Sequence, residues 1–201
     1  TATQMLETMQ ENPLPTRAEV SDVANAVYDQ TGCIMLSAES AMGKFPVKCV
    51  ETMDKIARTI EHSIKYWKRF NNRGCKVNPE DLEGNIAYTT CTTAEHLNAD
   101  AIVAYTHKGV SVRKIAGMGP GCPIFAITDC EKTYYQLAIA HNVYPVLIEG
   151  EKSIEDTISK GIAQLKDEGI LETGDTVVLA GGPKILPDAT ENKVIGGVVR
   201  V

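Results

Sequence analysis

The apolar positions between residues 16 and 36 predict an amphipathic helix followed by a short strand. Thr16 and Glu19 have the spacing of a capping box, in which a hydroxyl and a carboxylate satisfy free N–H groups at a helix start. The apolar positions of the helix recur at helical spacing: Val20, Val23, Ala24 and Val27. Residues 33–36 then form an unbroken apolar run, which is typical of a strand buried on both faces. A helix that leads into such a strand indicates a parallel α/β unit.

A second helix is predicted after Pro46, with one apolar face along its length. The positions that form this face are Val50, Met53, Ile56, Ala57, Ile60 and Ile64. Residues 1–6 have the pattern of the end of a strand and the turn after it. Two helices with so few strand residues cannot close a sheet, and an eightfold α/β barrel takes about 250 residues. We therefore expect residues 1–70 to be the last βα units of a TIM barrel, cut out of a longer chain.

Residues 71–77 are polar and contain a glycine, and we interpret them as a linker. Strands and helices alternate beyond it. The predicted strands cover residues 101–105, 123–128, 143–148, 176–180 and 194–201. The predicted helices cover residues 79–98, 111–117, 130–141 and 153–168. This alternation predicts that residues 78–201 form a separate domain with a doubly wound, mainly parallel five-stranded α/β fold, whose last strand can pair antiparallel at the edge.

Three helix starts in this second domain have specific signals. Pro79 is predicted at the first position of its helix, where the missing N–H would have no partner in any case. Thr128 with Glu131 and Ser153 with Asp156 both have capping-box spacing.

Charge and cysteine usage narrow the possible partners and the compartment. The net charge is −6, and no basic run is interleaved with aromatic residues, which argues against nucleic-acid binding. The six cysteines occur singly and the four histidines share no ligand spacing, so neither a metal site nor a disulfide framework is predicted. No signal peptide and no apolar stretch of membrane-spanning length is found in the sequence. We therefore expect a cytoplasmic protein with reduced thiols and no membrane partner.

Two strand ends carry candidate chemistry. Ser37 and Glu39 follow the strand expected at 33–36, and catalytic groups of parallel α/β folds gather where strands end. A helix-capping pair is the alternative for these two residues. Residues 106–111 connect a strand to a helix, so backbone N–H groups and two hydroxyls converge where an anion can sit. The alternative there is an ordinary turn with Ser111 as the helix N-cap.

Three stretches carry a family resemblance: ATQML at 2–6, PTRAEVSDVANAV at 15–27 and IMLSAESAMGKFP at 34–46. They resemble the C-terminal part of pyruvate kinase, which transfers a phosphoryl group from phosphoenolpyruvate to ADP and gives pyruvate and ATP in glycolysis. The resemblance continues in the order and spacing of the later elements, and so covers essentially the whole chain. It implies that residues 1–70 end the catalytic barrel and that residues 78–201 are the C-terminal regulatory domain.

The resemblance implies catalytic roles for two residues of the barrel part. Thr3 matches the family threonine at the substrate and proton-delivery side, and Ser37 matches a serine of the same hydroxyl and water network. Glu39 is the third candidate catalytic residue, and it follows Ala38, where the family usually has glycine. The phosphate and Mg²⁺ ligands of the family, and the K⁺ ligands where potassium is used, lie on earlier barrel strands. We therefore expect this segment to bind no metal ion and to be inactive alone.

The resemblance also implies an effector site and an assembly. The matching effector residues are Thr106, Gly109 and Ser111 in the strand-to-helix turn, which holds a phosphate of the allosteric sugar phosphate in the family. Lys108 is the further effector-binding candidate of this turn, since its positive charge would help to bind an anion. Lys184 lies in the opposing loop, which lacks the arginine-bearing pattern of fructose-bisphosphate-regulated members, so the phosphorylated effector stays open. Family members are dimers of dimers, which implies a homotetramer. An autonomous, non-catalytic sugar-phosphate-binding or assembly module is the alternative.

Overall fold

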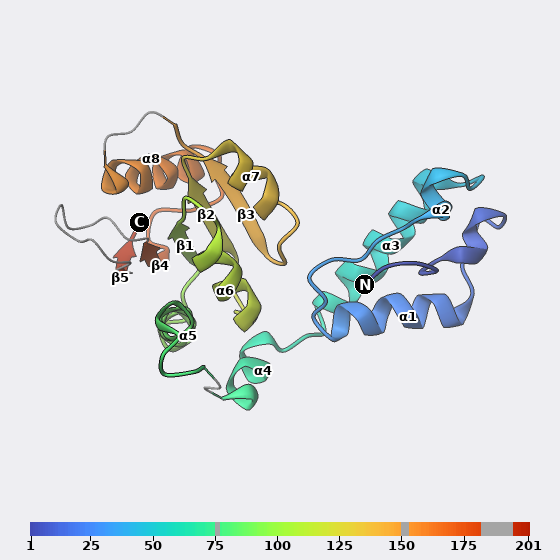
Figure 1. Ribbon diagram of the computed structural model, residues 1–201, viewed down its shortest axis with the longest axis horizontal. Coiled ribbons are helices and arrows are strands. Elements are labelled where there is room, and N and C mark those ends of the chain that lie inside the picture. Colours follow the sequence, from blue (N-terminus) through green and yellow to red (C-terminus); the bar gives the residue numbers. More distant parts are fainter. Residues whose placement is uncertain (75–76, 150–152, 182–194) are drawn as a thin grey trace. The chain divides into compact units, whose positions relative to one another are not determined.

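The computed structural model describes residues 1–74, 77–149, 153–181 and 195–201. The chain divides into two compact units, Thr1–Lys65 and Tyr66–Val201, and each is described by itself (Figure 1). The division falls before helix α4 (Tyr66–Arg73), whereas the sequence predicted a linker at 71–77. The reason is that α4 packs into the second unit: Phe70 is buried there and its ring stacks on Tyr88 at a centroid distance of 5.3 Å.

The first unit contains a 3₁₀ turn and three α-helices. They are η1 (Glu7–Gln10), α1 (Arg17–Tyr28), α2 (Ala38–Ala41) and α3 (Pro46–Glu61). Helices α1 and α3 pack against each other, and their core consists of Met5, Leu6, Met9, Val23, Cys49 and Met53. Both long helices are confirmed, but the predicted apolar faces are wrong at three positions. Val20 and Val50 are exposed, and Ile64 lies beyond the end of α3 at Glu61. On α3 the neighbouring Cys49 is buried instead of Val50, because the contact with α1 is centred one residue earlier.

The predicted capping box at the start of α1 is confirmed. Glu19 N donates to Thr16 Oγ1 at 3.3 Å, and Thr16 N donates to Glu19 Oε2 at 2.7 Å. The same carboxylate also accepts bonds from the backbone N and the hydroxyl of Thr8, at 2.7 and 2.6 Å. Burial raises the pKa of Glu19, but the bonds from Thr8 and Thr16 outweigh it and leave the pKa below its usual value. One side chain thus connects η1 to the start of α1.

The strand predicted at 33–36 is not formed. Met35 makes one isolated parallel bridge with Ala2, and its N–H donates to Thr1 O at 2.9 Å. Met35 is also 46% exposed, so the segment is not buried on both faces. A buried central strand needs a hydrogen-bonded neighbour on each side and packed layers above and below, whereas in the described residues this segment pairs only with Ala2.

The second unit is built on the five-stranded sheet that the sequence predicted. Its strands are β1 (Ala101–Tyr105), β2 (Ile124–Thr128), β3 (Val143–Leu147), β4 (Thr176–Gly181) and β5 (Ile195–Arg200), in the order β3-β2-β1-β4-β5. The first four are parallel, and β5 runs antiparallel to β4 with Arg200 opposite Thr176. The doubly wound, mainly parallel fold and its antiparallel edge strand are therefore confirmed.

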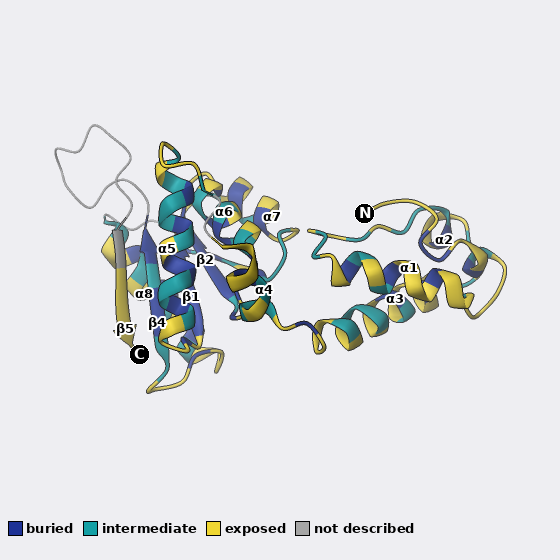
Figure 2. Ribbon diagram, turned by 90° about the horizontal axis from the view of Figure 1, so that it is seen from below, coloured by how far each residue is buried: buried dark blue, intermediate teal, exposed yellow. Residues whose placement is uncertain are grey.

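Helices cover both faces of this sheet. They are α5 (Leu82–His96), α6 (Val110–Met118), α7 (Glu131–Leu137) and α8 (Ile154–Asp167). Because successive strand residues point to opposite faces, Ile102 packs in the core under α5, α6 and α7, whereas Val103 packs in the core under α8. All residues of β1 and β2 are buried, and both strands are dark blue in Figure 2, while the surrounding helices also carry exposed faces.

Two predicted helix starts are wrong and one is confirmed. Helix α5 begins after Asp81 and not at Pro79, because the Asp81 carboxylate accepts a bond from Gly84 N at 3.0 Å and acts as the N-cap. Helix α7 has Cys130 as its N-cap residue, and no side chain caps it. The predicted capping box with Thr128 does not form, because the Thr128 hydroxyl accepts from Cys130 N and not from Glu131 N. Helix α7 also ends at Leu137, short of the predicted residue 141. At α8, Ser153 accepts from Asp156 N at 3.0 Å, as predicted.

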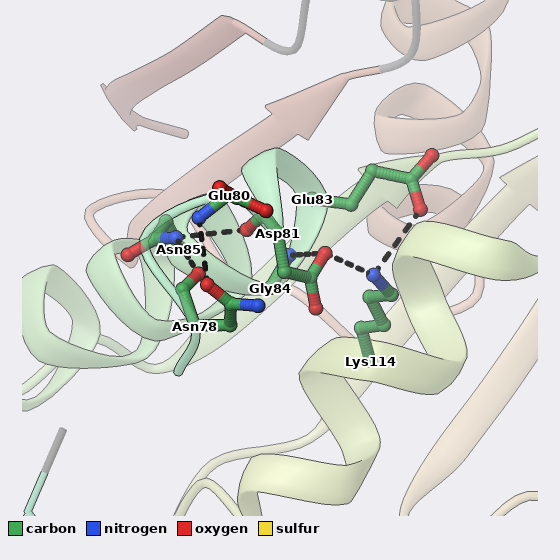
Figure 3. A network of polar contacts seen from close by, with 7 residues as sticks. All are labelled: Asn78, Glu80, Asp81, Glu83, Gly84, Asn85 and Lys114. Carbon is green, nitrogen blue, oxygen red and sulfur yellow. Dashed lines mark hydrogen bonds and ion pairs between the residues drawn. The ribbon is translucent and has the colours of Figure 1, made fainter. Parts of the chain in front are cut away.

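A polar network at the start of α5 fixes this helix to α6 (Figure 3). Lys114 from α6 lies 2.5 Å from Asp81 Oδ1 and 3.6 Å from Glu83 Oε2. The hydrogen bond from Lys114 lowers the pKa of Asp81, and the same bond raises the pKa of Lys114. Asn85 extends the network through its side-chain amide, which donates to the carbonyls of Asn78 and Asp81. The start of α5 is therefore joined to α6 by ion pairs as well as by packing.

Candidate functional site

The predicted catalytic residues lie around the bridge between Ala2 and Met35. Thr3 follows the bridge and has a φ of +69°, and Gln4 after it has a φ of +53°. Two consecutive left-handed residues that are not glycine are uncommon, and each costs about 1–3 kcal/mol unless surrounding contacts hold it. The chain therefore turns sharply at Thr3 and leaves this residue exposed at the end of the bridged segment.

Glu39 supplies the contacts that hold this turn. Its side chain is 1% exposed, Oε1 accepts from Leu6 N at 3.1 Å, and Oε2 accepts from Ser37 N at 2.8 Å. Burial raises the pKa of Glu39, but backbone hydrogen bonds, including those from Ser37 and Leu6, outweigh it and lower the pKa below its usual value. A charged carboxylate with both oxygens bound to the backbone is suited to positioning the segments that carry Thr3 and Ser37.

Ser37 begins the short helix α2 on the other side of Glu39. Its carbonyl accepts from Ala41 N at 3.0 Å, and its backbone φ and ψ are −121° and −104°. Its hydroxyl makes no capping bond to the helix, and the residue is half-buried. Thr3 and Ser37 thus come from two segments joined by the Ala2 bridge and by Glu39. Their catalytic roles stay predictions from the sequence.

The second predicted site is the effector turn, defined here as residues 106–111, between β1 and α6. Thr106 is buried, and its hydroxyl accepts a bond from Gly109 N at 2.9 Å. Gly109 has a φ of +78°, a conformation that favours glycine, and it is the N-cap residue of α6. The alternative with Ser111 as N-cap is therefore wrong, and Ser111 lies half-buried in the first helical turn. One backbone N–H of the turn is already used within it.

Arg113, in the first turns of α6, contacts the effector turn and was not predicted from the sequence. Its Nη2 donates to the Lys108 carbonyl at 2.8 Å, and a Cβ built at Gly109 would lie 2.7 Å from its Nη1. The guanidinium therefore lies directly against the turn. Its position four residues after Gly109, one helical turn on, was a signal that could have identified it. The predicted Lys184 lies outside the described residues.

A cluster of polar residues from β1, β2 and α7 borders the effector turn and was also missed. His107 Nδ1 lies 2.6 Å from Asp129 Oδ1, and Thr133 from α7 donates its hydroxyl to the His107 carbonyl at 2.7 Å. Tyr105 lies near the same carboxylate: burial, then the charge of Asp129, raise the pKa of Tyr105 to about 12. No sequence motif marks these residues, because they meet only where neighbouring parallel strands end.

Within residues 1–74, 77–149, 153–181 and 195–201, no three His, Cys, Asp or Glu side chains come together as a possible metal site. None of the described helices has the length and apolar character needed to cross a membrane. The cysteines of the same ranges are free thiols, and three of them, Cys49, Cys91 and Cys122, are buried.

Sequence comparison relates both units to one family. A family model for the pyruvate kinase barrel domain matches residues 1–50, and one for the pyruvate kinase alpha/beta domain matches residues 84–194. Pyruvate kinase of Clostridium acetobutylicum is 40% identical over 194 residues, which are 96% of this chain and 40% of that protein. Pyruvate kinase of Thermotoga maritima is 36% identical over 181 residues, 90% of this chain and 38% of that protein.

Structural comparison leads to the same family. The structure of Cryptosporidium parvum pyruvate kinase in complex with ADP matches with a TM-score of 0.83 and 33% sequence identity, and covers 100% of this chain and 40% of that one. The chain thus spans about two fifths of the length of these relatives. On these matches, and on the barrel and alpha/beta domain models that fall on its two halves, the chain belongs to the pyruvate kinase family.

Proposed function

We propose that this chain is the C-terminal part of an enzyme that transfers a phosphoryl group from phosphoenolpyruvate to ADP and then protonates the enolate to pyruvate. The observation that carries the proposal is that the Ala2–Met35 bridge and the Glu39 carboxylate join the segments of Thr3 and Ser37, in a stretch that matches the barrel domain of the family. The Cryptosporidium parvum relative forms a complex with ADP, which supports ADP as a substrate here.

The proposed roles follow from the chemistry of the side chains. A hydroxyl at a strand end can donate to a developing enolate or pass a proton through water, and a positioned proton donor is worth about 10²–10⁴-fold in rate. Thr3 and Ser37 would supply these hydroxyls. Glu39 would act as a positioning residue, since its two oxygens accept backbone N–H groups on both sides of the site.

Phosphoryl transfer also needs cations that neutralise phosphate charge. Mg²⁺, and K⁺ where it is used, would supply this in the complete enzyme. The described residues do not group three metal-ligating side chains, and the donors for these ions would come from other parts of a longer chain.

The second unit would bind a phosphorylated metabolite at the effector turn. Backbone N–H groups at the start of α6 favour an anion, and Lys108 and Arg113 add positive charge beside them. The unit would also join subunits into a homotetramer in the cytoplasm. The outermost strand β5 supports such an assembly, since its Val198 and Val199 are exposed.

A chimeric enzyme tests the catalytic proposal. Residues 1–201 would replace the matching C-terminal part of the Clostridium acetobutylicum enzyme, and pyruvate formation would be followed with a coupled lactate dehydrogenase assay. We expect turnover in the chimera, none in the 201-residue chain alone, and a kcat lowered about 10²–10⁴-fold by Thr3→Ala.

Two controls accompany this assay. Thr3→Ser keeps the hydroxyl and should retain most of the turnover, and Thr59→Ala removes an exposed α3 hydroxyl that bonds only to Lys55 O and should change nothing. A folded chimera without turnover would contradict the catalytic proposal. A Thr3→Ala variant with normal kcat and raised KM would show that Thr3 only binds substrate.

A further inference from the structure

The closest ionisable pair beside the effector turn is His107 with Asp129. Their Nδ1 and Oδ1 atoms are 2.6 Å apart, and the side chains are 59% and 40% exposed. His107 belongs to the effector turn itself, whereas Asp129 follows β2, the neighbouring parallel strand. The carboxylate therefore lies at the border of the place where the proposed phosphate would bind.

Two neighbouring side chains lie against the pair. Thr133 donates its hydroxyl to the His107 carbonyl at 2.7 Å, and Asp129 is close enough to Tyr105 for its charge to raise the pKa of that hydroxyl. Nδ1–H can donate to Asp129 whether or not Nε2 carries a proton. Protonation thus changes the charge of the pair without requiring a new contact.

Other charged and titratable side chains lie on the elements around the pair. The turn and α6 carry Lys108 and Arg113; the segment after β2 carries Cys130, Glu131 and Lys132. Hydrogen bonds from Thr133 lower the pKa of Cys130. Imidazole is the side chain that ordinarily changes charge between about pH 5 and about pH 8, and His107 carries the imidazole of the effector turn.

We propose that His107 and Asp129 make anion binding at the effector turn tighter as the pH falls, because a proton on the imidazole cancels the carboxylate charge beside the turn. The pair carries a net charge of about −1 when the imidazole is neutral and about 0 when it is protonated. The proposal rests on the effector turn suggested above. Because both side chains are partly exposed and screened by water, the effect on affinity should be roughly two- to fivefold.

Sulfate is a suitable probe, since it stays a dianion throughout this pH range, whereas phosphate esters change their own charge. Binding of sulfate to the 201-residue chain would be followed by NMR at the amides of Gly109, Val110 and Ser111, at about pH 5.5 and about pH 8. We expect affinity to be roughly two- to fivefold higher at the lower pH. His107→Asn, which keeps a donor for Asp129 but does not titrate, should abolish the difference.

Two further measurements make the test specific. His96→Asn makes the same change at an exposed position of α5 and should leave the pH dependence intact. In the unmodified chain, sulfate should shift the titration midpoint of the His107 ring upward, since binding and protonation are linked reciprocally. This measurement needs no variant and therefore does not depend on how well His107→Asn folds.

The outcomes separate this proposal from the effector site on which it rests. Sulfate binding with equal affinity at both pH values, or with the same pH dependence in His107→Asn, would overturn the role of the pair and leave the effector turn standing. If the three amides do not respond to sulfate at either pH, the effector turn itself is wrong and the pair has no ligand to regulate.

Discussion

The two units of this chain hold their backbone segments together in different ways. In the first unit two buried carboxylates, Glu19 and Glu39, accept backbone N–H groups from segments distant in sequence, and the parallel pairing is one isolated bridge. In the second unit a five-stranded ladder joins the segments, and β1 and β2 are buried along their whole length. A carboxylate joins two segments by hydrogen bonds at one point, whereas the backbone hydrogen bonds of a ladder repeat along the length of paired strands.

This difference indicates which kind of substitution should destabilise each unit. Loss of one acceptor in the first unit leaves buried N–H groups without a partner, which is costly. The second unit instead depends on close packing of helices against the sheet, where adding or removing one methyl group changes the free energy of unfolding. Hydrogen exchange of the full chain reports on the two units separately, so each variant below is compared with the other unit as an internal reference.

Phe70→Ala should have the largest effect. Phe70 is 4% exposed in the second unit, where its ring packs on Trp67 and Tyr88. Truncation of a buried phenylalanine typically costs about 3–5 kcal/mol, so exchange protection of residues 66–201 should fall by that amount and protection of residues 1–65 should not. The exposed Lys68→Ala on the same helix is the control. Equal losses in both units would contradict the assignment of α4 to the second unit.

Glu39→Ala should destabilise the first unit by about 2–4 kcal/mol. It leaves the buried N–H of Leu6 without its acceptor at about 1–3 kcal/mol, and the part-buried N–H of Ser37 at a smaller cost because water can reach it. Denaturant-dependent exchange of residues 1–65 measures it. Glu51→Ala removes an exposed carboxylate of α3 and is the matched control. If both variants behaved alike, the proposed positioning role of Glu39 would be wrong.

Acidification should act on the same contact. The pKa of Glu39 is lowered in the folded chain, so its ionised form contributes stability above the unfolded pKa of about 4.3, and this contribution is lost as the pH falls through the folded pKa. Glu19 behaves in the same direction. Protection of the first unit should therefore decline in acid, and Glu39→Gln should decline less steeply. A steeper decline in Glu39→Gln would refute this assignment.

Gly161→Ala should destabilise the second unit by about 1–3 kcal/mol, the usual cost of overpacking. A Cβ at Gly161 on α8 would overlap Ile127 Cδ1 and come within 2.8 Å of its Cγ1, on β2. Ile127→Val removes that Cδ1, so the double variant should recover part of the loss in a double-mutant cycle. Purely additive losses would show that α8 does not pack on β2 as closely as the structure indicates.

The smallest effects are expected at the helix caps, and here the units can be compared directly. Ser153→Ala in α8 and Thr16→Ala in α1 each remove a side-chain acceptor from a helix start. Each should cost about 0.5–2 kcal/mol in its own unit, measured by the same exchange experiment. Ser153→Asn and Thr16→Ser retain an acceptor and should cost less. A loss confined to the wrong unit would contradict the separation of the two units.

Local sequence signals predicted the second unit well. Its five strands and their mixed pairing follow from short apolar runs separated by helical segments, because each strand is buried by neighbours that lie in the same unit. The capping box of Thr16 and Glu19 was also predictable, since its partners are three residues apart. The start of α5 was not predictable in this way. Asp81 and not Pro79 begins the helix, since the Asp81 carboxylate accepts from Gly84 N and also bonds to Lys114 of α6, 33 residues away.

The sequence by itself determined the strand order along the chain of the second unit and its mainly parallel sheet with an antiparallel edge, since these follow from patterns within a few residues. Thr3, Ser37 and the effector turn stay predictions from the sequence and from the family resemblance. Only the tertiary structure decided that 33–36 is not a buried strand, that both oxygens of Glu39 bind backbone N–H groups, and that Arg113, His107 and Asp129 border the turn. The physical reason is that burial and ion pairing depend on which distant segments meet, and no local pattern records that.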